Sequence, residues 1–291
     1  PSAKLSLLQE LAMASNALDV SVELKSKPID SMSFSDSAAP LGPRALLKNF
    51  ELNSSPKIEK KVDYIVSDTD AKSADSLNEL FYSDFSVGFI SKLLSAGLLG
   101  EKKSRKFVPT KWSITATDSS LSENLIEEKI KGFSNIDRTQ IFSASYLDNN
   151  FFILLAPHSW AFEQLEVMLS ETDPKIISDF EFFDKRKDYA SNVAGAYYAA
   201  RLAVAEYLLK IRRQAAVVVF REIGRSYKRS LGVWVIRESI RAAMQKNPID
   251  FASTSLALQF LEKKFFVPVG KYRLSSKVLD LVLHQKSLAD F

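Results

Sequence analysis

The chain has 291 residues, of which 46% are hydrophobic and 25% are charged, with a formal net charge of +4. These are ordinary values for a folded globular protein, so extensive disorder is not expected. The sequence contains no cysteine, which excludes disulfides, thiolate nucleophiles and cysteine-ligated zinc or iron–sulfur centres. His158 and His284 lie far apart and without a companion carboxylate pattern, so we expect neither a metal site nor a histidine-centred triad. No apolar run reaches the roughly 20 residues of a membrane helix, and we expect a cytoplasmic protein that does not contact the membrane.

Residues 1–135 are predicted to form a largely helical N-terminal part. The first residues have helical apolar spacing, and Val20, Val22 and Leu24 then alternate as in a half-buried strand. Within 73–131 we expect two short helices, a basic hairpin at Lys102–Lys106, an extended stretch at 107–114 and a third helix from about 119. This order resembles a winged-helix DNA-binding module, in which one helix enters the major groove and the wing touches the backbone.

Residues 136–280 are predicted to form an α+β domain with an antiparallel-rich sheet. Strand-like runs at 140–147, 150–156 and 161–169 surround a tight turn near Asp148, and 215–220 is an apolar, β-branched run typical of a central strand. Apolar residues spaced by threes and fours predict a long central helix over 187–214. The predicted fold class of the whole chain is therefore α+β, mixed helices with an antiparallel-rich sheet.

The last residues carry Gln285, Leu288 and Phe291 at intervals of three. In one turn of tight helix this spacing places the two apolar side chains next to each other, while the amide stays free to hydrogen-bond beside a pocket. The pattern closely resembles the peptide with which proteins of archaea and eukaryotes attach to the sliding clamp, PCNA, although that peptide usually has two aromatics. We therefore expect 281–291 to be a clamp-binding tail. In the alternative, Leu288 and Phe291 pack on the chain's own core.

Short stretches along most of the chain are similar to those of the archaeal Nre family. They are 8–15, 40–43, 66–70, 92–99, 109–116, 186–190, 196–200, 212–214, 221–223 and 232–234. This resemblance implies a DNA-repair role linked to the sliding clamp. Many members of the family carry a four-cysteine zinc element and a longer N-terminal portion, and this cysteine-free sequence beginning at Pro1 shows neither. We therefore expect no metal and no cofactor.

Basic and aromatic residues form three clusters that suit phosphate neutralisation and base stacking. The residues that we expect to contact nucleic acid or a nucleotide are Lys103, Arg105, Lys111, Trp112, Arg186, Lys187, Tyr189, Arg212, Arg213 and Arg221. In the alternative interpretation the lysines lie on a solvated turn, the arginines complement a helix end and the aromatics belong to the core.

An enzyme is the main alternative to a DNA-repair adaptor. Polar strings at 111–118, 186–189 and 221–238 have the composition of a pocket for a phosphate-bearing ligand, as in a nuclease or in NAD-dependent ADP-ribosyl transfer. No phosphate-binding glycine loop, aspartate-rich cluster or nucleophile–base spacing accompanies them in the sequence, so the catalytic residues are unknown.

Overall fold

The computed structural model describes residues 3–35 and 40–284, and the chain divides into two compact units, Pro1–Leu121 and Ser122–Phe291. The tail residues Gln285, Leu288 and Phe291 lie outside the described residues. The boundary between the units falls within helix α5 (Thr110–Glu128). Each unit is described by itself below.

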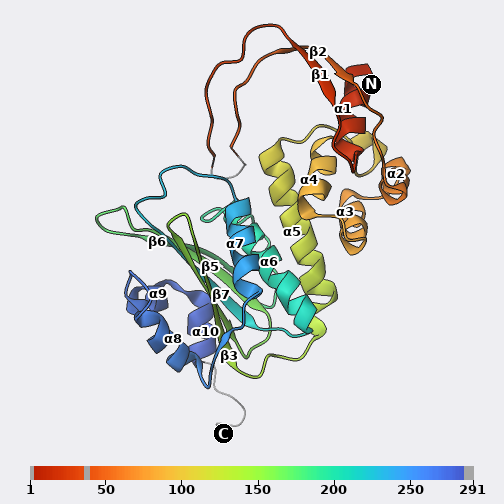
Figure 1. The fold of residues 1–291 in the computed structure, drawn as a ribbon. Helices are drawn as coiled ribbons and strands as arrows, with labels where there is room; N and C mark the ends of the chain where they lie inside the picture. The colour runs from red at the N-terminus through yellow and green to blue at the C-terminus, as the bar shows by residue number, and fades with distance from the viewer. Residues whose placement is uncertain (1–2, 36–39, 285–291) are drawn as a thin grey trace. The chain divides into compact units, whose positions relative to one another are not determined.

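The first unit combines short helices with a two-stranded antiparallel ribbon (Figure 1). Its elements before α5 are α1 (Ala3–Met13), β1 (Val20–Leu24), β2 (Leu47–Leu52), α2 (Lys60–Ser67), α3 (Ser73–Tyr82), α4 (Val87–Ser95) and η1 (Lys102–Ser104). Ile65, Leu80, Ile90 and Leu93 are at most 2% exposed, so α2, α3 and α4 each contribute an apolar face to the core of this unit. The side chain of Ser86 accepts a hydrogen bond from the backbone of Phe89 and so caps α4.

The predictions of a hairpin and of an extended stretch between α4 and α5 were wrong. The basic run forms a 3-10 turn, η1, and α5 begins at Thr110, within the stretch predicted to be extended. The backbone N–H groups of Trp112 and Ser113 both bond to the carbonyl of Pro109, 2.8 and 3.0 Å away. Proline needs no N–H partner and has a φ suited to the start of a helix, so Pro109 starts α5 despite the β-branched residues that follow it. The described segment 73–131 therefore holds helices without a β-wing.

The second unit is built on a six-stranded sheet with the order β6-β5-β7-β4-β3-β8. Its strands are β3 (Thr139–Tyr146), β4 (Asn149–Ala156), β5 (Ala161–Met168), β6 (Ile176–Glu181), β7 (Ala216–Ile223) and β8 (Ile249–Phe251). All neighbouring strands pair antiparallel except β5 and β7, which are parallel. The predicted α+β class is thereby confirmed, as are the three expected strands and the central strand β7, which is buried along its whole length.

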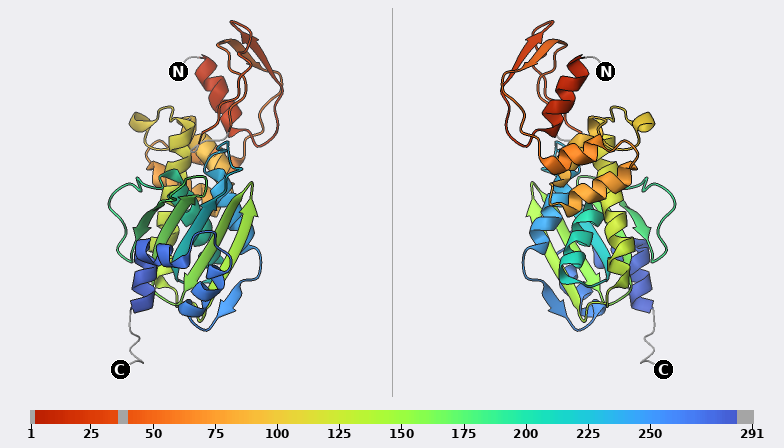
Figure 2. Two further views of the ribbon diagram at one scale, coloured as in Figure 1. Left: turned by 90° about the vertical axis from the view of Figure 1, so that its left-hand side faces the viewer. Right: turned by 90° about the vertical axis from the view of Figure 1, so that its right-hand side faces the viewer.

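Helices cover both faces of this sheet, as Figures 1 and 2 show. α6 (Gly195–Ile211) and α7 (Trp234–Met244) lie on one face, and α8 (Thr254–Glu262), α9 (Val269–Ser275) and α10 (Lys277–His284) lie on the other. The short 3-10 helix η2 (Ile130–Gly132) precedes β3. Helix α6 is the expected long helix, but it begins at Gly195 rather than at 187. Among the described residues, no helix is both long and apolar enough to cross a membrane.

Two buried carboxylates of the sheet anchor the C-terminal helices. Glu222 of β7 accepts the backbone N–H groups of Phe266 and Val267 and the hydroxyl of Tyr272, at 2.9 to 3.1 Å. Glu163 of β5 accepts the hydroxyl of Ser276 at 2.5 Å and the backbone N–H of Val278 at 2.9 Å. The bonds of Glu163 satisfy groups at the start of α10, and those of Glu222 hold the segment before α9 and α9 itself, so both carboxylates fix these helices to the sheet.

Candidate functional site

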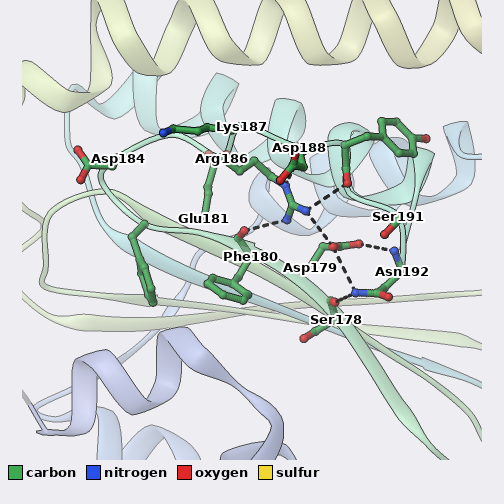
Figure 3. Close-up of a pocket in the computed structure, with 12 residues that line it drawn as sticks. Ser178, Asp179, Phe180, Glu181, Asp184, Arg186, Lys187, Asp188, Ser191 and Asn192 are labelled. Atoms are coloured by element: carbon green, nitrogen blue, oxygen red, sulfur yellow. Dashed lines mark hydrogen bonds and ion pairs between the residues drawn. The ribbon is translucent and has the colours of Figure 1, made fainter.

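A polar pocket lies in the second unit, between the edge strand β6 and the loop that leads to α6 (Figure 3). It is an open cavity of about 470 Å³. Its lining includes three of the residues predicted from sequence, Arg186, Lys187 and Tyr189. The other lining residues are Ser178, Asp179, Phe180, Glu181, Phe182, Asp184, Asp188, Ser191 and Asn192.

Asp179 is the centre of this pocket, and sequence reasoning did not single it out. Its side chain is 4% exposed and lies 3.1 Å from the guanidinium of Arg186. The same carboxylate accepts the backbone N–H groups of Asn192 and Val193, each at 2.8 Å. A buried carboxylate requires such partners, and here they tie 186–193 to the strand. This is why 187–194 is a loop and not the first turns of α6.

Arg186 is fully engaged within the protein. Besides Asp179, its guanidinium donates to the backbone carbonyls of Phe180, Asp188 and Tyr189 at 2.8, 2.9 and 3.3 Å. The amide of Asn192 donates to the carbonyl of Ser178 at 2.9 Å, so loop side chains reach the backbone of β6 at two places. Because its N–H groups bond to acceptors within the protein, we assign Arg186 a role in shaping the pocket and not in binding a ligand.

Of the pocket residues predicted from sequence, Tyr189 and Lys187 are exposed. Tyr189 is 55% exposed, and its ring stacks on that of Tyr198 at 5.4 Å between centroids. Burial of part of this ring and the nearby Tyr198 and Asp179 raise the pKa of Tyr189, so its hydroxyl remains a hydrogen-bond donor near neutral pH. Lys187 is exposed, and its side chain extends away from Asp179 (Figure 3).

Arg221 of β7 is a buried residue. It is 6% exposed and bonds to the side-chain oxygen of Asn149 at 2.7 and 3.0 Å and to Glu166 at 3.1 Å. On the same face of the sheet, four positions away along β5, Arg201 of α6 pairs with Glu181 at 2.7 Å. Arginines held in this way satisfy buried carboxylates, and we therefore do not assign Arg221 to nucleic acid. Of the guanidinium groups in the polar strings of the enzymatic alternative, which also include that of Arg237, those of Arg186 and Arg221 are occupied internally.

The basic segment of the first unit contains both structural and exposed cations. The guanidinium of Arg105 donates to the carbonyls of Val66, Asp68 and Gly100 at 2.5 to 2.7 Å, and burial lowers its pKa from the usual value. Lys103 is 83% exposed at its side chain and lies 3.0 Å from Glu101. Lys111 and Trp112 are exposed in the first turn of α5. Arg105 therefore fixes this segment, while the lysines and the indole face solvent.

Arg212 and Arg213 lie at the end of α6, where Arg212 adopts a left-handed conformation with φ 53° as the C-cap. Both are exposed. Among the described residues, no group of three or more histidine, cysteine, aspartate or glutamate side chains could hold a metal ion. Of the cations predicted from sequence to bind a ligand, the exposed ones thus lie in three places: at 102–112, at Lys187 and at the end of α6.

These features define a two-unit α+β protein with an anchored helical layer and exposed basic segments. The chain belongs to the archaeal Nre family, as the sequence resemblance predicted: the model of the Nre N-terminal region matches residues 2–173 and that of the C-terminal region matches 181–291.

Three curated relatives align over nearly the whole chain. It is 38% identical to the DNA repair protein NreA of Archaeoglobus fulgidus, over 99% of this chain and 72% of that protein. It is 36% identical to the DNA repair protein NreB of the same organism, over 93% and 70% of the two chains. For the DNA repair protein NreA of Haloferax volcanii the identity is 33%, over 97% and 69%. No solved structure matches this chain significantly.

Proposed function

We propose that this protein is a DNA-repair accessory protein that binds the sliding clamp through Gln285, Leu288 and Phe291 and contacts DNA through exposed basic and aromatic side chains. The single observation that carries the clamp contact is the three-residue spacing of these side chains. The names of the relatives, all DNA repair proteins, support the cellular process.

The position of the tail along the chain supports the clamp contact. Residues 285–291 follow directly on α10, which buries Val278 and Leu279 and is bonded to Glu163 of the sheet. A docking peptide needs a firm point of attachment to the body of the protein and apolar side chains that can enter a partner's groove. Helix α10 supplies the first, and Leu288 and Phe291 supply the second.

The DNA contact is supported by the difference between three arginines that are held internally and two lysines that are exposed. Arg105, Arg186 and Arg221 are held by internal acceptors. Lys111 and Lys187 are exposed, and no ion pair of theirs occurs among the described residues. Exposed cations of this kind neutralise phosphates and release counterions, which makes DNA affinity fall as salt is raised.

The test of the clamp contact is titration calorimetry of an archaeal PCNA ring with the full chain and with tail variants. Leu288→Ala combined with Phe291→Ala is expected to weaken binding at least about 30-fold, the effect of losing a hot-spot side chain from an interface. The control, Lys286→Ala with Ser287→Ala, changes the positions between the motif residues and is expected to bind as the unaltered chain does. Equal clamp binding by the double variant and by the unaltered chain would refute the proposal.

A further inference from the structure

The first unit contains a groove that the proposed clamp contact does not use. Helix α1 forms one wall, and the connection between α4 and α5 forms the other. The groove has a volume of about 720 Å³, and its surface is mainly apolar. Apolar side chains from both walls and from α2 line it, namely Leu5, Met13, Val66, Leu98 and Phe107.

The rim of this groove is basic. Lys102 and Lys106 line it and are exposed, and no ion pair of theirs occurs in the described part of the chain. Glu10 is the acidic residue among the lining side chains. The groove therefore combines an apolar floor with a positively charged edge, which suits an anionic partner that also has apolar surface.

The wall that carries these lysines is held in place by the backbone. Arg105 bonds to carbonyls of three other residues, at 2.5 to 2.7 Å. Gly97 has φ +69°, and a Cβ at this position would lie 2.8 Å from the backbone of Lys106. The two segments can approach this closely because residue 97 is glycine. Lys106 and Phe107 are thus presented from a fixed segment, and little ordering is needed on binding.

Two aromatic side chains stand exposed on this segment. Phe107 is 57% exposed at the groove, and Trp112 is 63% exposed in the first turn of α5. They are five residues apart, so their Cα atoms are at most about 17 Å from each other. Lys106 and Lys111 each directly precede one of these aromatics. Exposed rings next to cations are the combination with which proteins bind single strands, whose bases offer free faces for stacking.

We propose that this groove binds single-stranded DNA, with one base stacked on Phe107, another on Trp112, and the phosphates held by Lys102, Lys106 and Lys111. This inference rests on the proposed contact with DNA and specifies single-stranded DNA as the form that is bound. A duplex keeps its bases stacked on one another, so it can use the lysines but not the rings. A protein helix could fill the apolar floor, but it would leave the lysines without acceptors, and so the charges favour the nucleic acid.

The test compares the binding of a fluorescent oligothymidylate and of a duplex of equal length to the full chain, measured by anisotropy. Phe107→Ala is expected to weaken single-strand binding by about 5- to 150-fold, the effect of losing one stacking contact, and to leave duplex binding unchanged. Phe107→Trp is expected to restore it. The matched control is Phe266→Ala, which removes a phenylalanine that is 72% exposed in the other unit.

A second variant changes a residue on the other wall of the groove. Ser6→Glu places a negative charge on α1, where Ser6 lines the groove, and it leaves the aromatics untouched. It is expected to weaken single-strand binding while circular dichroism and the unfolding temperature stay unchanged. Quenching of the Trp112 fluorescence by the oligothymidylate, absent in Trp112→Phe, is the expected sign of stacking at the second ring.

The outcomes separate the two proposals. If the unaltered chain binds neither oligonucleotide, the proposed DNA contact fails and this inference fails with it. If it binds both equally, and Phe107→Ala and Ser6→Glu have no effect on either, the DNA contact stands and the groove is not its site. Weakening by Lys102→Gln and Lys106→Gln without any effect of Phe107→Ala would show a purely electrostatic contact and would also overturn the inference.

Discussion

Asp179 is expected to determine the structure of the loop that forms the pocket beside β6, and Asp179→Asn tests this. The aspartate accepts from Arg186 on one oxygen and from the backbone N–H groups of Asn192 and Val193 on the other. Asparagine has one acceptor oxygen, and its amide nitrogen is a donor. In either orientation, the substituted side chain brings a donor against a donor in a site that is 4% exposed.

The expected cost follows from these contacts. Removing one partner of a buried ion pair costs about 3 to 5 kcal/mol, mainly because the remaining charge is left uncompensated. Arg186 is 20% exposed at its side chain and keeps its three carbonyl acceptors, which places the cost at the lower end of that range. We therefore expect Asp179→Asn to lower the free energy of unfolding by about 3 kcal/mol.

Urea denaturation measures this cost, and limited trypsin digestion reports on the loop, which contains Lys185, Arg186 and Lys187. The variant is expected to be cleaved there faster than the unaltered chain. Asp184→Asn is the control, because it removes an exposed carboxylate from the same loop. A loss below about 1 kcal/mol, with cleavage as slow as in the control, would show that the loop does not depend on Asp179.

Two further predictions concern the sheet of the second unit. Burial raises the pKa of Glu163 above its usual value of 4.5, so its stabilising contribution is complete below pH 4.5 and is lost as the pH rises through the folded-state pKa. Glu163→Gln should therefore gain stability relative to the unaltered chain between pH 4 and pH 8 in urea titrations; a pH-independent difference would contradict this. Leu147 has φ 48° in the two-residue turn between β3 and β4, a conformation that asparagine tolerates better than leucine. Leu147→Asn should raise the free energy of unfolding by about 0.5 to 1 kcal/mol, and a decrease in thermal unfolding experiments would count against the turn assignment.

The elements that could be predicted from sequence are those fixed by local pattern. β4 and β7 each contain a continuous apolar run, and such runs indicate buried strands whatever the rest of the chain does. The start of α6 could not be predicted in this way, because Asp179 binds the backbone of Asn192 and Val193, 13 and 14 residues further along the chain. Similarly, the basic run before α5 has the composition of a hairpin wing, but Pro109 starts a helix directly after it.

The candidate site was even harder to predict from sequence, for the same reason. Arg105 and Lys106 are neighbours with the same charge in the sequence, yet one is held by internal carbonyls and the other is exposed at the groove. The acceptor of Arg105 at Val66 lies 39 positions away and is a backbone oxygen, which carries no mark in the sequence. Composition can therefore indicate where cations gather, whereas tertiary contacts decide which of them remain available to a ligand.

The contacts of Arg186 and Asn192 with β6 also affect how the sheet meets other chains. β6 pairs with β5 along one side, and the carbonyls of Ser178 and Phe180 on its other side accept from those two side chains. An edge strand with free carbonyls is a template for intermolecular strand addition and aggregation. The loop thus covers carbonyls at this edge, and a loop that detaches from β6 should allow the protein to self-associate through this strand.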